Sequence, residues 1–376
     1  MDSVDLYKAV GGRSMCRRLS EAFYARVKRD SALQPLFPGK SMRCAVNAFA
    51  AFLAQFLGGP TEDAEERWWL SLRESHLRFK IGPKERQAWM SNMLKALEDL
   101  PVDEPVRRAL RDLFERSSAY IVNIGQAPGE SASPEDESQD RIYREISERW
   151  AEQRALDDLI AAIRDGDSRR ALEFAQSPTL ELRFSRDRAV FAHALGLLMA
   201  AGSDALLEYT ERELVADPAL ASAHNRYGRT LLHDASGQNN LRMVELLLRL
   251  GADPNVGKHP PLYCVANECP VTGGGAIVHA LVRAGARVDE RSESKRCSAL
   301  HMAARRGNTE VAEALLDCGA DINALDRAGV TPLQRAKNCR KAAVVLLLLS
   351  RGADDNLSPT STRGSTRGGK GANRRR

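Results

Sequence analysis

One histidine near the front of the chain is a residue that could do chemistry. His76 is the only histidine in the first 190 residues, and it begins the short run HLRF that ends at Phe79. A neutral imidazole binds transition metals well and is a common axial ligand for haem iron. A lone histidine is weak evidence by itself, so the elements around His76 decide whether it can act as a ligand.

Amphipathic helices are expected around this histidine. Apolar residues recur every three to four positions within residues 15–29, 42–57, 83–97 and 106–121, as they do along one face of a helix. Gly58, Gly59 and Pro60 would end the second of these helices, and Pro83 is well placed as the first residue of the third. We therefore expect an all-helical domain over residues 1–125, whose helix faces could line a flat macrocycle.

Five short segments follow one another along this domain: FYARV at 23–27, PLFPG at 35–39, FLGGP at 56–60, HLRF at 76–79 and ERQAW at 85–89. In this order and spacing they resemble the truncated haemoglobins of group II, over about residues 5–125. The resemblance implies a haem-binding globin fold in which His76 is the proximal iron ligand. The other ring nitrogen of His76 would then be oriented by a backbone carbonyl or a similar acceptor.

The resemblance also implies roles for further pocket residues. Tyr24 and Trp89 match the distal tyrosine and tryptophan of the family, whose O–H and N–H groups would donate hydrogen bonds to a bound gas. The walls of the pocket would come from Phe37, Ala45, Phe49 and Phe79. Ala45 matches the usual position of a distal histidine and would leave room for ligand entry, whereas Phe49 is bulkier than the expected leucine.

Two positions differ from residues that are common in the family. Phe37 replaces a tyrosine found in some relatives, so a third donor is missing. Ser75 stands where an arginine is common, and the haem propionates would then pair with Arg73, Arg78 or Lys80.

The middle of the chain carries no recognisable chemical motif. Residues 126–141 are rich in Pro, Gly, Ser and acids and have no apolar face, which predicts a linker. Residues 142–224 are expected to be helical again, with one helix over Ala155–Phe174 and two more within 189–202 and 204–217. We interpret this stretch as degenerate helical hairpins that lead into the next segment.

Residues 225–356 contain a repeat of about 33 residues. Gly251, Gly285, Gly319 and Gly352 are spaced by 34, 34 and 33 residues, and each follows a pair of aliphatic residues. Runs of the type TLLH, SALH and TPLQ precede three of these glycines by a constant distance. This pattern resembles about four ankyrin repeats, in which stacked helix pairs share one core.

Two features of the repeats bear on function. His233 and His301 occupy equivalent places in the repeats, so we interpret them as structural residues and not as metal ligands. The second repeat is longer, because NECPVTGG at 267–274 is inserted between its helices. A neutral loop expansion is the favoured interpretation, with a place on the binding face as the alternative.

Charge and cysteine content exclude several classes of protein. The formal charge of +5 includes six positive charges in residues 357–376, so the remainder carries −1 and offers no nucleic-acid surface. That tail is rich in Gly, Ser, Thr and Arg and is expected to be disordered. The seven cysteines are scattered without a zinc spacing, and no run of eighteen apolar residues occurs. We expect reduced thiols and a cytoplasmic protein that crosses no membrane.

The expected fold class is all-α, with a short truncated-globin domain followed by a helical ankyrin-repeat solenoid. The leading functional hypothesis is a haem protein that binds dioxygen or nitric oxide and engages a protein partner through its repeats, for gas or redox sensing or for delivery. One alternative is a haem-dependent nitric oxide dioxygenase or peroxidase-like enzyme, which would need an external reductase because no dinucleotide fingerprint occurs. Another is a haem-free interaction scaffold.

Overall fold

The computed structural model describes residues 6–37, 42–59, 72–125, 141–224, 228–270, 272–292 and 296–357. The predicted linker and the basic tail lie almost entirely outside the described residues, as does the end of the PLFPG segment. Helices account for 68% of the chain, and no strand occurs among the described residues, which confirms the all-α expectation. In the described part of the chain, no helix combines the length and the apolar character that crossing a membrane requires. Two compact units are present, Met1–Thr210 and Glu211–Arg376.

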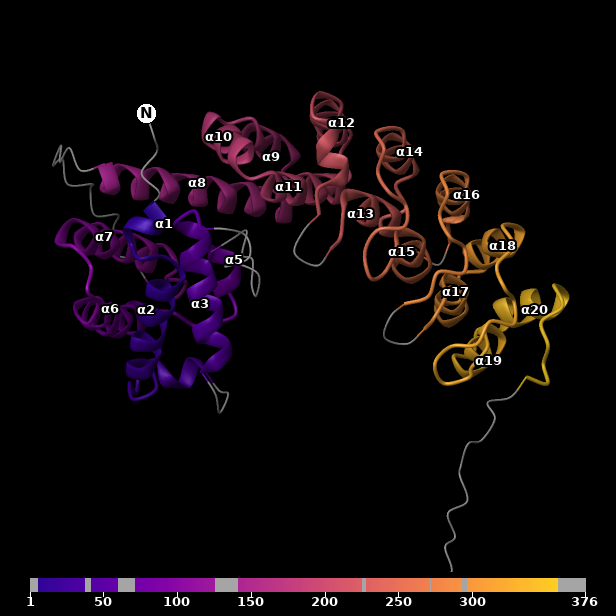
Figure 1. The fold of residues 1–376 in the computed structure, drawn as a ribbon, viewed down its shortest axis with the longest axis horizontal. Helices are drawn as coiled ribbons and strands as arrows, with labels where there is room; N and C mark the ends of the chain where they lie inside the picture. The colour runs from indigo at the N-terminus through magenta and orange to yellow at the C-terminus, as the bar shows by residue number, and fades with distance from the viewer. Residues whose placement is uncertain are drawn as a thin grey trace, which may run out of the picture. The chain divides into compact units, whose positions relative to one another are not determined.

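The first unit begins with a bundle of helices (Figure 1). They are α1 Leu6–Ala9, α2 Gly12–Val27, the short 3-10 helix η1 Gln34–Leu36, α3 Arg43–Phe56, α5 Leu72–His76, α6 Pro83–Glu98 and α7 Glu104–Tyr120. The predicted start of α6 at Pro83 is confirmed, and its first turn is closed by Glu85, whose side chain accepts the Gly82 N–H at 2.9 Å.

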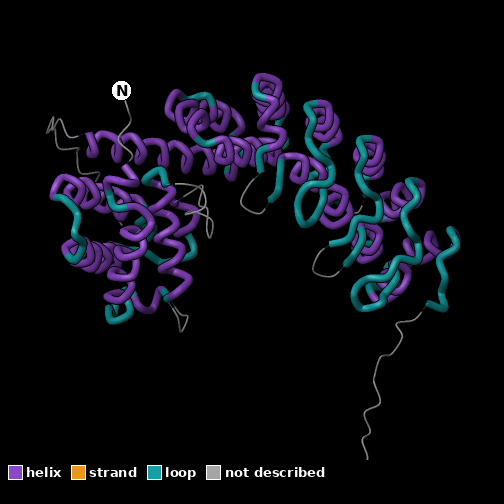
Figure 2. The backbone as a smooth tube through the Cα atoms, in the orientation of Figure 1, coloured by secondary structure: helices purple, strands orange, loops and turns teal. Residues whose placement is uncertain are grey.

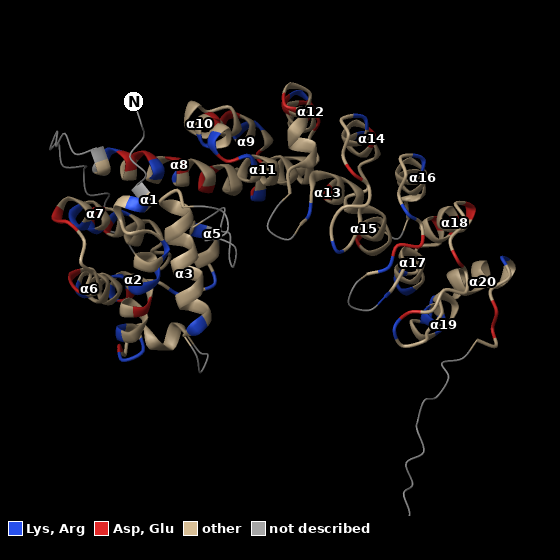
Figure 3. Cartoon of the chain, viewed as in Figure 1, with Lys and Arg blue, Asp and Glu red and all other residues tan. Residues whose placement is uncertain are grey.

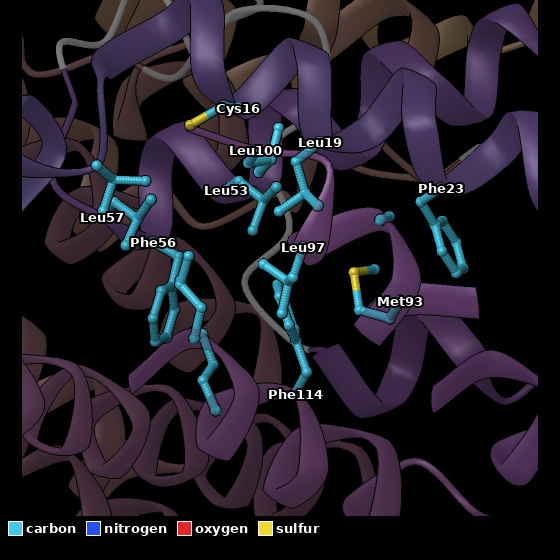
Figure 4. Close-up of a cluster of buried hydrophobic side chains, with 14 of the residues drawn as sticks. Cys16, Leu19, Phe23, Leu53, Phe56, Leu57, Met93, Leu97, Leu100 and Phe114 are labelled. Carbon is cyan, nitrogen blue, oxygen red and sulfur yellow. The ribbon is translucent and has the colours of Figure 1, made fainter. Parts of the chain in front are cut away.

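One hydrophobic core joins these helices (Figure 4). Phe23 of α2, Leu53 of α3, Met93 and Leu97 of α6 and Phe114 of α7 are each at most 2% exposed. Because the apolar residues of each helix lie on one face, packing these faces together removes them from water and fixes the bundle.

Helix α8, Arg141–Arg164, belongs to the same unit and lies along the bundle (Figure 1). Ile146 and Trp150 of α8 are 0% and 5% exposed and form part of the core that Phe23 and Phe114 also line. The Arg149 guanidinium donates to the Phe56 carbonyl at 3.3 Å. The core of the bundle therefore extends into a helix beyond residue 125.

The remaining helices of this unit are α9 Ser168–Ala175, α10 Pro178–Arg186, α11 Arg188–Ala201 and α12 Asp204–Ala216, the last of which runs into the second unit. The single helix expected over Ala155–Phe174 is wrong, because α8 ends at Arg164 and α9 begins at Ser168. Gly166 adopts a left-handed φ of 73° between them, and the Asp167 side chain caps α9 by accepting the Arg170 N–H at 3.0 Å.

The second unit consists of helix pairs joined by loops (Figure 2). After η2 Pro218–Ser222 come the pairs α13 Leu231–Gly237 with α14 Leu241–Arg249, α15 Pro261–Glu268 with α16 Gly275–Arg283, α17 Ala299–Arg306 with α18 Thr309–Asp317, and α19 Pro332–Asn338 with α20 Ala342–Ser350. One residue separates the end of the second helix of each pair from a repeat glycine, with φ of 88° at Gly251, 95° at Gly285, 87° at Gly319 and 88° at Gly352. This left-handed conformation ends each helix, and glycine adopts it without a steric penalty.

The expected insertion NECPVTGG begins inside α15, because Asn267 and Glu268 are the last two residues of that helix, and its later residues lie between α15 and α16. Charged side chains are spread over both units, whereas α3 and α20 are largely free of them (Figure 3).

All seven cysteines are free, and four of them are buried, namely Cys16, Cys264, Cys269 and Cys297.

Candidate functional site

His76 is the last residue of α5, and its ring is held by the first residue of the same helix. The Nδ1 atom lies 2.7 Å from the Leu72 carbonyl oxygen. The Ser75 hydroxyl donates to this carbonyl at 2.6 Å and lies 2.9 Å from Nδ1. Because a carbonyl can only accept, Nδ1 must carry the proton. The lone pair of the neutral ring is therefore on Nε2.

The surroundings of His76 keep this ring neutral. Burial lowers the pKa of His76 below its ordinary value, and the positive charge of Arg78 lowers it further, while the hydrogen bond to Leu72 acts in the opposite direction. No partner contacts Nε2 among the described residues. A neutral imidazole with a free Nε2 is the form that ligates iron.

Haem iron needs only one ligand from the protein at this position, because the porphyrin supplies four nitrogens. The neutral His76 ring, whose Nε2 contacts none of the described residues, can be that ligand. The Phe79 ring, 6.3 Å from that of His76, is an apolar neighbour suited to a flat macrocycle. The residues present at His76 thus fit haem.

A chain of aromatic rings leads away from His76. The ring centroids of His76 and Phe79 are 6.3 Å apart, those of Phe79 and Phe37 are 6.2 Å apart, and those of Phe37 and Tyr24 are 5.5 Å apart. Phe49 of α3 lies 6.3 Å from Tyr24. The structure therefore brings five of the seven predicted site residues together through ring contacts.

Trp89 joins this group through two phenylalanines that the helical spacing places on inward faces but that were not predicted as site residues. Phe23 lies 5.0 Å from Tyr24 and 5.2 Å from Trp89, and Phe114 lies 5.7 Å from Trp89 and 6.2 Å from Phe49. Phe23 precedes Tyr24 in FYARV, and Phe114 lies on the inward face of α7, so both could have been found as core neighbours of the site.

The Tyr24 hydroxyl and the Trp89 indole N–H make no hydrogen bond to the described residues. Burial raises the pKa of Tyr24 far above its ordinary value, so its hydroxyl stays protonated at neutral pH. Both groups therefore keep a proton that they can donate.

Ala45 and the predicted partners of the haem propionates make fewer contacts with the aromatic rings of the site. Ala45 lies one helical turn before Phe49 on α3, and its methyl side chain adds no ring contact. The Arg78 guanidinium lies 4.7 Å from the centre of the Phe79 ring, beside the site. That of Arg73 lies instead over Tyr120, at 5.7 Å, on the side of α7. Of the predicted propionate partners, Arg78 thus contacts one ring of the aromatic wall, and Arg73 contacts Tyr120 instead.

The repeat histidines differ from His76 in that both of their ring nitrogens are engaged. Nδ1 of His233 accepts the Thr230 N–H at 2.9 Å, and its Nε2–H donates to the Val256 carbonyl at 3.1 Å. His301 repeats this arrangement with the Ser298 N–H and the Val330 carbonyl, at 3.3 and 3.0 Å. The structural role predicted for both histidines is confirmed.

Comparison with known proteins places these features in a family. Residues 5–123 match the family model of bacterial-like globins. The group 2 truncated hemoglobin YjbI of Bacillus subtilis is 32% identical over 126 residues, which are 34% of this chain and 94% of that protein. The crystal structure of the hemoglobin from Chloroflexus aurantiacus is 37% identical and covers 32% of this chain and 98% of its own, with a TM-score of 0.30.

The second unit matches a different family. Residues 227–259 match a single ankyrin repeat, and residues 266–358 match a model of three ankyrin repeats. The mitochondrial disaggregase of Bos taurus is 31% identical over 125 residues, which are 33% of this chain and only 18% of that protein.

The N-terminal part of the chain therefore belongs to the truncated globin family, which is a haem-binding family, and ankyrin repeats follow it. Ankyrin repeats are protein-interaction modules, so the chain combines a haem-protein fold with a surface for a protein partner.

Proposed function

We propose that the globin domain binds haem through His76 and takes a diatomic gas, dioxygen above all, and that the repeats join this domain to a protein partner. The observation that carries the proposal is the His76 ring, which is neutral, fixed through Nδ1, and without a partner at Nε2 among the described residues. Haem, when bound, would supply the iron that coordinates the gas.

His76 would hold the iron, and Leu72 would orient His76. A hydrogen bond from the far nitrogen of a ligating histidine to a carbonyl fixes the ring plane and makes the ligating nitrogen more basic. The 2.7 Å contact with the Leu72 carbonyl is such a bond.

Tyr24 and Trp89 would act on the gas. Their O–H and N–H groups are both donors, and neither has an acceptor among the described residues. A dioxygen ligand polarised by the haem would accept such hydrogen bonds from the two side chains. Two donors would hold the gas tightly and slow its release.

Phe37, Phe49 and Phe79 would form the apolar walls. Their rings lie next to Tyr24 or His76, so they would pack on a flat macrocycle and exclude water. Exclusion of water strengthens the hydrogen bonds of Tyr24 and Trp89 to the gas, because the local dielectric constant is low.

The ankyrin repeats suggest how gas binding would be used. A gas-binding domain carried on a protein-interaction module suits local sensing of gas or redox state, or delivery to a partner, and we propose this role by analogy with the architecture.

Absorption spectra of the haem-reconstituted protein test the proposal. We expect the wild-type chain to show a sharp Soret band that shifts reversibly when dioxygen is added to the reduced protein, and we expect His76→Ala to lose it. His259→Ala is the matched control, since it removes an exposed imidazole from the second unit. A Soret band that survives His76→Ala unchanged, or no band in the wild type, would overturn the proposal, and the latter result would favour a haem-free scaffold.

A further inference from the structure

Asp157 of α8 contacts the helix that carries His76, although α8 lies beyond the residues that match the globin family. Its carboxylate accepts the Leu72 N–H at 2.9 Å through Oδ1 and the Arg73 N–H at 3.2 Å through Oδ2. The Gln153 side chain donates to Oδ1 at 3.0 Å. Asp157 is only 2% exposed, so these bonds are shielded from water.

Helix α5 depends on partners of this kind. It has only five residues, from Leu72 to His76, and an isolated helix of this length is unstable in water. The first N–H groups of a helix have no partner within it, and an aspartate is among the best caps. Here the cap comes from a residue 85 positions further along the chain.

The other end of this segment is held as well. The Asn123 side chain donates to the Phe79 carbonyl at 2.7 Å and accepts the Ile81 N–H at 2.9 Å. The segment that carries His76 and Phe79 is therefore hydrogen-bonded at both ends, to Asp157 of α8 and to Asn123, which follows α7.

Leu72 connects Asp157 directly to His76. Its N–H is bound by the Asp157 carboxylate, and its carbonyl accepts the His76 Nδ1–H at 2.7 Å. A shift of Leu72 would therefore turn the imidazole ring. The geometry points to Asp157 as a positioning residue for His76, and this inference rests on the proposed haem function.

This role would make α8 a working part of the haem site. Helix α8 also packs against α9, α10 and α11. Asp157 would thus tie the orientation of the iron ligand to helices that lie outside the globin match.

Amide hydrogen exchange of the haem-free, full-length protein tests the hydrogen bonds of Asp157 to α5 alone. Loss of an N-terminal cap is expected to speed exchange at Leu72 and Arg73 about fivefold in Asp157→Ala, with a smaller effect in Asp157→Asn, which keeps one acceptor. Asp158→Asn is the matched control, since Asp158 neighbours Asp157 on α8 and makes no bond to α5. Wild-type exchange rates in both Asp157 variants would overturn the inference.

The haem-loaded protein tests the effect on the ligand. We expect the iron–histidine stretching band in resonance Raman spectra to shift or broaden in both Asp157 variants, and haem loss to an acceptor protein to be several-fold faster. Asp158→Asn should match the wild type in both measurements. Faster exchange with an unchanged stretching band would leave Asp157 a mere helix cap and overturn its positioning role. No Soret band in the wild type would instead refute the proposed function, whatever the exchange rates show.

Discussion

His233 should make the stability of the ankyrin unit depend on pH. Burial, aided by the nearby charge of Arg229, lowers the pKa of His233 to about 4. Its Nδ1 already accepts the Thr230 N–H, so a second ring proton would face a donor and break the cap. We therefore consider His233→Gln, because Gln334 fills the same place in the last repeat and accepts the Thr331 N–H at 3.1 Å without titrating.

The size of this pH effect follows from the shift in the pKa of His233. The ordinary pKa of 6.5 falls to about 4, and each unit is worth about 1.4 kcal/mol, so full protonation of His233 would cost about 3.5 kcal/mol. The folded state binds the proton less well than the unfolded state. The contribution of neutral His233 to the free energy of unfolding is therefore complete above pH 6.5 and is lost as the pH falls toward 4. When the pH is lowered from about 7.5 to about 5, the free energy of unfolding of the wild type should fall by about 2 kcal/mol more than that of His233→Gln.

Urea unfolding at both pH values measures this difference. Circular dichroism follows the helices of both units, whereas all four tryptophans lie within the first 150 residues, so their fluorescence reports on the first unit alone. Unfolding that circular dichroism detects and tryptophan fluorescence does not is therefore that of the array. Subtracting the pH effect in the variant from that in the wild type cancels every other titrating group. If both proteins lose the same stability on acidification, the assigned pKa shift of His233 is refuted.

Two further outcomes are expected. Tyr24→Phe should raise the dissociation rate of dioxygen from the haem-loaded protein about tenfold, because it removes one hydrogen bond to a partly charged atom, and an unchanged rate in stopped-flow mixing would exclude Tyr24 as a donor. Gly274→Ala should lower the melting temperature of the array more than Gly285→Ala does. Both glycines have φ of 95°, but a Cβ at Gly274 would lie 2.7 Å from a valine methyl, while one at Gly285 meets nothing within 4 Å; equal effects would mean that backbone strain alone sets the cost.

Features encoded by neighbouring residues could be predicted from the sequence. The repeat glycines, the start of α6 at Pro83 and the capping roles of His233 and His301 each rest on signals within a few residues. The break between α8 and α9 was missed because the apolar spacing continues across Gly166, and the left-handed turn interrupts the helix without interrupting that pattern.

Contacts between distant segments could not be predicted in this way. The bond from Asp157 to Leu72 and the burial of Trp150 in the globin core join residues that no spacing relates. Likewise, Phe23 and Phe114 connect Trp89 to Tyr24 and Phe49 only once the four helices α2, α3, α6 and α7 have packed together. The aromatic surroundings of the site are thus a property of the packed bundle.

The extension of the globin core into α8 bears on how this protein can be divided. A fragment that ends at Asn123, where the family match ends, would lack Ile146 and Trp150. These side chains are 0% and 5% exposed in the whole chain. It would expose the apolar surface that these side chains cover and leave the first N–H groups of α5 to water. The match covers 94% of the Bacillus subtilis protein, whereas the compact unit of this chain continues to Thr210, so the end of the family match and the end of the packed unit fall at different residues.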